Sequence, residues 1–120
     1  MAIATARTVV LDAPDPVALA GFYAQIIGGE VKDNGEGWVD LEGASETLLS
    51  FQAAPGLVPP AWPSAEHSQQ FHLDFTVADL DAAEKEVLRI GAVALDAEDR
   101  ERSFRVYRDP AGHPFCLCAC

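Results

Sequence analysis

A histidine and an aspartate lie two residues apart in a short apolar segment, at His72 and Asp74. Apolar residues alternate with them, which is typical of a β-strand whose successive side chains point to opposite faces. His72 and Asp74 therefore share one face, where the carboxylate could orient the imidazole and raise its pKa for general-base catalysis. In the alternative interpretation, the two side chains are simply solvated or hydrogen-bonded to a neighbouring strand.

The other face of the same strand is apolar and is expected to pack on a helix. Its residues are Phe71, Leu73, Phe75 and Val77.

Three cysteines follow near the end of the chain, at Cys116, Cys118 and Cys120. Residues two apart in a strand are separated by about 6–7 Å, which is too far for a comfortable disulfide. Their odd number and the lack of a secretory signal indicate reduced thiols. We expect them to pack as small apolar residues at the end of the last strand, with a metal clip as the alternative.

Length and charge exclude several classes of function. A chain of 120 residues is expected to form one domain. The formal net charge of −11 argues against nucleic acids and anionic membranes as partners and favours a neutral or cationic ligand. No apolar run is long enough to span a membrane, so we expect a cytoplasmic protein.

The pattern around His72 repeats one near the start of the chain. Asp79 follows the strand expected at 72–77 and is placed to cap a helix, and Asp15 follows an earlier apolar strand in the same way. Pro16 suits the first helical position. The two caps are 64 residues apart (79 − 15 = 64). After each cap, apolar residues recur at helical spacing until a glycine ends the run. This pattern predicts two equivalent helices.

Three short strands are expected after each helix, because alternating or apolar runs are separated there by turn residues. The fold class is therefore α+β, with two β-α-β-β-β modules at about 5–53 and 70–119 and a proline-rich connector at about 54–69. The six strands are expected at 30–33, 37–41, 47–52, 92–95, 103–108 and 114–118.

Three segments resemble the vicinal-oxygen-chelate superfamily of glyoxalase, bleomycin-resistance and extradiol-dioxygenase proteins, and most closely its small bacterial glyoxalase-like members. They are "FYAQIIGGEV", "HLDFTVADLDAA" and "RDPAGHPFCLC". The resemblance implies that the two modules form one open barrel of curved sheets around a pocket, with both helices outside. It also implies a homodimer, since relatives of this size commonly pair.

The resemblance further implies where metal ligands lie in metal-dependent relatives. The four matching places hold Thr8, Gln52, His72 and Cys116, and the 64-residue offset relates them in pairs (72 − 8 = 64; 116 − 52 = 64). None is a carboxylate, so no metal cofactor is expected. If a divalent metal does bind, His72, Gln52 and Cys116 are its implied ligands.

Three functions remain open. The first is metal-free binding of a small organic ligand, cationic or aromatic, with Thr8, Gln52, His72 and Cys116 as contacts and Trp62 at the rim. The second is an enzyme, either a metal-dependent lyase or isomerase or a ring-cleaving dioxygenase, for which His72 and Asp74 are the catalytic candidates. The third is an interaction or regulatory dimer with a vestigial pocket.

Overall fold

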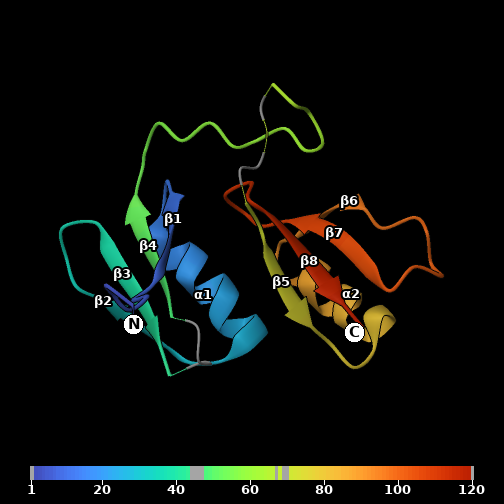
Figure 1. Ribbon diagram of the computed structural model, residues 1–120, viewed down its shortest axis with the longest axis horizontal. Coiled ribbons are helices and arrows are strands. Elements are labelled where there is room, and N and C mark those ends of the chain that lie inside the picture. The colour runs from blue at the N-terminus through green and yellow to red at the C-terminus, as the bar shows by residue number, and fades with distance from the viewer. Residues whose placement is uncertain (1, 44–47, 67, 69–70, 120) are drawn as a thin grey trace. The chain divides into compact units, whose positions relative to one another are not determined.

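The computed structural model describes residues 2–43, 48–66, 68 and 71–119. The chain divides into two compact units, Met1–Leu57 and Val58–Cys120. Among its described residues, each unit has one helix and four strands in the order β-α-β-β-β (Figure 1). This confirms the prediction of an α+β fold built from two such modules. The open barrel, and the grouping of both modules into one domain, stay predictions.

The first unit is a four-stranded sheet in the order β1-β4-β3-β2, in which β1 and β4 are parallel and the other pairs are antiparallel. Its expected strands agree with the observed ones to within two residues, although Thr47, in the strand expected at 47–52, lies outside the described residues. The elements are β1 Val9–Ala13, α1 Pro16–Ile27, β2 Glu30–Asp33, β3 Trp38–Glu42 and β4 Leu49–Ala53.

The second unit repeats this topology in the order β5-β8-β7-β6, again with one parallel pair, β5 and β8. Its first strand is shorter than expected, so His72 directly precedes it. Phe71 is 63% exposed, and its expected packing on the helix is wrong because the strand alternation does not extend back to it. The elements are β5 Leu73–Thr76, α2 Leu80–Arg89, β6 Val93–Asp96, β7 Phe104–Arg108 and β8 Pro114–Cys118.

Both helices begin and end where the sequence indicates. The Asp15 carboxylate accepts a hydrogen bond from the backbone N–H of Ala18, and the Asp79 carboxylate accepts two from the first turn of α2. Gly28 and Gly91 follow the helices with φ of 80° and 118°, a conformation that favours glycine. These caps satisfy backbone groups that the helices leave unpaired.

Each helix packs on one face of its own sheet, and that face is largely apolar (Figure 1). In the first unit Tyr23 of α1 stacks on Phe51 of β4, with ring centroids 5.9 Å apart. In the second unit Tyr107 and Phe115 stack at 5.8 Å on the side that α2 covers. Because strand side chains alternate, the remaining residues of each sheet lie on its other face, which we call the helix-free face.

The strand register shows that the 64-residue offset predicted from the sequence does not hold for the last strand of each module. Val10 pairs with Ser50, and Asp74 pairs with Cys116. Val10 and Asp74 are 64 residues apart (74 − 10 = 64), whereas Ser50 and Cys116 are 66 apart (116 − 50 = 66). Ser50 is therefore the structural equivalent of Cys116, and matching Gln52 to it is wrong. A two-residue slip keeps every side chain on the same face, so the alternation pattern could not reveal it.

Neither helix, within the described part of the chain, is long and apolar enough to cross a membrane.

Candidate functional site

The helix-free face of the second sheet brings together three groups that could do chemistry. His72 Nε2 lies 3.1 Å from Asp74 Oδ1. Cys116 of β8 lies directly opposite Asp74 of β5 in the parallel register. One ligand atom from each of the three side chains lies within 4.8 Å of the other two. The sequence predicted that His72 and Asp74 share a face, and the structure adds Cys116 beside them.

The three side chains differ in their access to solvent. Those of His72 and Asp74 are 36% and 67% exposed, whereas Cys116 is buried. Burial, together with the negative charge of Asp74 and the hydrogen bond that the thiol donates to this carboxylate, raises the pKa of Cys116 to about 11. The thiol is therefore protonated at neutral pH. A protonated thiol is a poor nucleophile.

The positively charged side chain of Arg102 lies near the residues that pair with Cys116 across the sheet. Val106 of β7 faces Cys116, and Asp96 of β6 faces Val106. The guanidinium of Arg102 lies 3.1 Å from Asp96 Oδ2 and 4.1 Å from the centre of the Phe104 ring. The positive charge of Arg102 acts against the rise in the Cys116 pKa, as a secondary cause.

The helix-free face of the first sheet holds a carboxylate that sequence reasoning missed. Asp40 is only 7% exposed, and its Oδ1 accepts hydrogen bonds from Ser50 Oγ at 2.5 Å and Trp38 Nε1 at 3.0 Å. Asn34 Nδ2 donates to the other oxygen at 2.9 Å. These donors, the Ser50 hydroxyl first among them, hold the pKa of Asp40 below its usual value. An aspartate between Val39 and Leu41 in an apolar strand was the signal that could have revealed it.

Thr8 and Gln52 lie on this face too, each with a partner in its own sheet. Thr8 Oγ1 is 2.8 Å from Ser50 Oγ, which links it to the Asp40 carboxylate. The exposed Gln52 donates from Nε2 to Asp12 Oδ1 at 2.8 Å. The structure thus groups His72 with Cys116 in one unit and places Thr8 and Gln52 on one face of the other. That all four contact one ligand stays a prediction.

Trp62 lies half-buried in the connector and precedes a cis peptide bond to Pro63. The connector also packs on the turn before β8. Pro59 approaches Gly112 so closely that a Cβ at that glycine, whose φ is 98°, would overlap the proline ring. The place of Trp62 at the rim of a ligand site stays a prediction.

The cysteines do not all share one state. Cys116 is free and buried, as expected. Cys118, however, is disulfide-bonded, so the prediction of reduced thiols is wrong for this residue. The spacing argument applies only between two residues of one regular strand, and β8 ends at Cys118. Cys120 lies outside the described residues.

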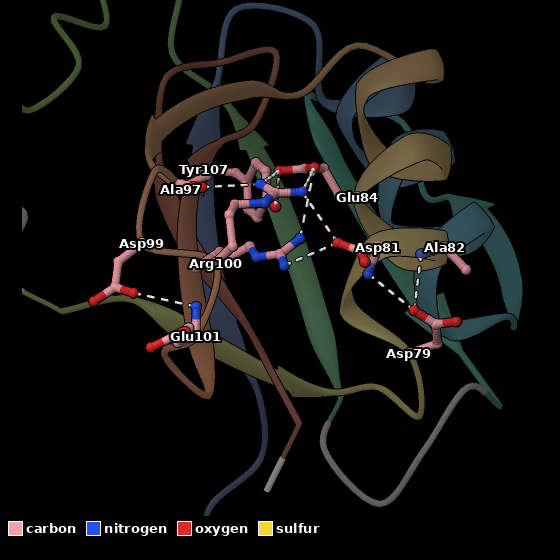
Figure 2. Close-up of polar contacts among 10 residues, drawn as sticks. Asp79, Asp81, Ala82, Glu84, Ala97, Asp99, Arg100, Glu101 and Tyr107 are labelled. Carbon is pink, nitrogen blue, oxygen red and sulfur yellow. Dashed lines mark hydrogen bonds and ion pairs between the residues drawn. The ribbon is translucent and has the colours of Figure 1, made fainter.

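A second polar cluster joins α2 to its sheet on the opposite face (Figure 2). Glu84 accepts a hydrogen bond from the Tyr107 hydroxyl at 2.8 Å and contacts Arg100 Nη2 at 2.7 Å. The buried Arg105 contacts Asp81 at 2.9 Å and Glu84 at 3.6 Å. The hydrogen bond from Arg100 is the main cause that lowers the pKa of Glu84, and burial with Glu84 beside it raises the pKa of Tyr107. Two arginines balance two carboxylates, so this cluster holds the helix on the sheet.

The fold, with one helix on each of two four-stranded sheets, is that of the glyoxalase/bleomycin-resistance/dioxygenase class. The chain matches the family model described as a glyoxalase-like domain over residues 8–118 and belongs to that family. This confirms the resemblance drawn from the sequence. No curated protein matches the chain.

Several solved structures share the fold at low sequence identity. A glyoxalase/bleomycin resistance protein/dioxygenase family enzyme from Burkholderia phytofirmans PsJN is 18% identical, with a TM-score of 0.69 over 92% of this chain and 94% of its own. A fosfomycin resistance protein from Mesorhizobium loti is 13% identical, with a TM-score of 0.71 over 98% and 92%. A bleomycin-binding protein from Streptomyces verticillus, complexed with copper(II)-bleomycin, is 18% identical, with a TM-score of 0.59 over 100% and 99%.

Proposed function

We propose that this protein binds a small organic molecule through the helix-free faces of its sheets, with His72 as a direct contact. The observation that carries the proposal is the separation of polarity in both sheets. The faces under the helices are largely apolar, whereas the helix-free faces carry the linked groups Thr8, Ser50 and Asp40 in one unit and His72 with Asp74 in the other. A few polar groups on a partly apolar surface are the usual composition of a ligand site.

The charges favour a cationic or neutral ligand with an aromatic part. The chain carries a net charge of −11. The Asp40 carboxylate is hydrogen-bonded by three uncharged side chains, which stabilise its ionised form together with the positive charge of Arg7. Trp62 and the indole of Trp38 offer aromatic surface for such a ligand. We propose Thr8, Gln52 and Cys116 as the remaining contacts.

A thermal-shift screen of cationic and aromatic compounds tests the proposal, since a ligand that binds the folded state raises the melting temperature. For a compound found in this way, His72→Ala should weaken binding by about 1–2 kcal/mol, the scale of a lost hydrogen bond. His113→Ala is the matched control, because that histidine lies in the turn before β8. Affinity that ignores His72→Ala but is abolished by Trp62→Ala would contradict the assignment of His72.

A metal-dependent lyase, isomerase or ring-cleaving dioxygenase is the second candidate. It is favoured by the convergence of His72, Asp74 and Cys116, which offer nitrogen, oxygen and sulfur donors. Turnover of a substrate with adjacent oxygen atoms, abolished by a chelator and restored by metal, would establish the enzyme. Finding neither ligand nor turnover would leave the interaction dimer.

A further inference from the structure

We propose that the disulfide of Cys118 is a redox site, which exchanges with low-molecular-weight thiols and disulfides while the second unit stays folded. Cys118 is disulfide-bonded, and Cys116 is a free thiol. The sequence holds three cysteines, so Cys120, which lies outside the described residues, is the one cysteine left to pair with Cys118. The site is then the segment Cys118-Ala119-Cys120. It is independent of the organic ligand proposed above.

The exchange has two steps. The thiolate of a small thiol attacks one sulfur of the disulfide, the sulfur–sulfur bond breaks, and a mixed disulfide forms beside one protein thiolate. A second small thiolate attacks the mixed disulfide and releases a small-molecule disulfide and the other protein thiolate. Two electrons thus pass from the two small thiols to the protein, and the two protons that these thiols lose are taken up by the two cysteines. A small disulfide oxidises the pair by the reverse steps.

Backbone hydrogen bonds hold the end of β8 without help from the disulfide. Cys118 pairs with Thr76 of β5 and with Phe104 of β7. Its carbonyl accepts a hydrogen bond from the Val77 N–H at 2.9 Å, and the N–H of the next residue donates to the Ser103 carbonyl at 2.8 Å. A disulfide stabilises a fold mainly by closing a loop in the unfolded chain, and a loop of only three residues contributes little. The bond can therefore open and close while β8 stays in place.

Cys118 is easier to reach than the third cysteine. It is half-buried, whereas Cys116 is only 7% exposed. The rate of thiol–disulfide exchange depends on access to the sulfur that is attacked. The two residues share the helix-free face of β8, but positions two apart in a strand are separated by about 6–7 Å, too far for a comfortable disulfide between them. A small thiol from solvent is therefore the partner that the geometry favours.

Peptide mapping tests the pairing on the full chain purified without a reducing agent. The protein is alkylated with N-ethylmaleimide in denaturant and digested with trypsin, which cleaves after Arg108 and leaves all three cysteines in one peptide. We expect a single label, at Cys116, on a peptide that is lighter by two hydrogen atoms than its reduced form. Labels on all three cysteines, a bond between Cys118 and Cys116, or a disulfide-linked dimer would overturn the proposal.

Reduction kinetics in native buffer test whether the folded protein exchanges. The rate should rise in proportion to the concentration of 2-mercaptoethanol, with an unchanged circular dichroism spectrum, and bis(2-hydroxyethyl) disulfide should restore the bond. Cys120→Ser should abolish the bond, whereas Cys116→Ala, the control, should keep it. The wild-type rates decide the outcome if a variant does not fold. A rate that levels off at the rate of unfolding, a fold lost on reduction, or loss of the bond in folded Cys116→Ala contradicts the proposal.

Discussion

Asp40 and Asp74 show how the surroundings of one residue type decide its effect. Asp40 is enclosed by three uncharged donors that stabilise its own charge. Asp74 is exposed, and its charge instead acts on the thiol across the strand, where it adds to burial in raising the pKa of Cys116. An aspartate on the first sheet is thus stabilised as an anion, whereas an aspartate on the second sheet raises the pKa of the neighbouring thiol.

This difference predicts a change in the reactivity of Cys116 in the metal-free protein. Asp74→Asn removes the negative charge and should lower the Cys116 pKa from about 11 toward its usual value, although burial still acts. Because only the thiolate is alkylated, the rate of iodoacetamide modification at pH 8 should rise several-fold, up to roughly tenfold for one pKa unit. Asp12→Asn, in the other unit, is the control. An unchanged pH midpoint of alkylation in Asp74→Asn would contradict the assigned cause.

At the scale of the element, the Glu84 cluster is the main polar link between α2 and its sheet. Glu84 accepts from Tyr107 of β7 and pairs with Arg100, so it ties the helix both to a strand and to the segment before that strand (Figure 2). Its side chain is only 15% exposed. Two side-chain nitrogens of the buried Arg105 have no hydrogen-bond partner among the described residues, so removing the charge of Glu84 would leave this guanidinium with less compensation.

We therefore expect Glu84→Gln to lower the free energy of unfolding by about 2–3 kcal/mol, the scale of hydrogen bonds to charged groups in partly buried sites. Glu86→Gln on the same helix is the matched control. Glu86 pairs with Arg89 but is 67% exposed, so its loss should cost less than about 0.5 kcal/mol. Urea denaturation at pH 7 compares the two. Equal effects would contradict a structural role for the cluster.

The same residue predicts an acid dependence of stability. The folded-state pKa of Glu84 lies below its ordinary value of 4.5, so its stabilisation is present above that pH and is lost as the pH falls through the folded pKa. Wild-type protein should therefore lose more stability than Glu84→Gln between pH 5 and the acid limit of folding. Parallel pH profiles for the two proteins would contradict this linkage.

At the scale of the whole molecule, apolar side chains remain exposed at both ends of the connector. Val58 is 83% exposed and Phe71 is 63% exposed. Large apolar side chains left in water favour association when a complementary surface is offered by a second copy.

We expect a homodimer, and light scattering across a wide range of concentrations should give twice the chain mass. Phe71→Ser should shift the protein toward the monomer without unfolding it, since the side chain is exposed. Leu88→Ser, at a residue of α2 that is 43% exposed, is the control. A monomer mass at every concentration would reject the dimer.

Sequence alone predicted most of the local structure and, within the regular strands, the face to which the side chains point. Caps such as Asp15 and Asp79 act through hydrogen bonds within one helical turn, and alternation with a period of two places His72 and Asp74 on one face, so neighbouring residues carry the whole signal.

Which residue lies opposite which on neighbouring strands became known only from the folded structure. Cys116 faces Asp74 across a parallel pair separated by more than 40 residues of chain, and a two-residue slip would preserve every face while changing every partner. Asp40 accepts a hydrogen bond from Ser50 on the neighbouring strand, and Arg105 donates to Asp81 of the helix, so these contacts also depend on how distant segments pack. The alternation of polar and apolar residues is identical before and after such a slip, so register had to come from packing across the whole sheet.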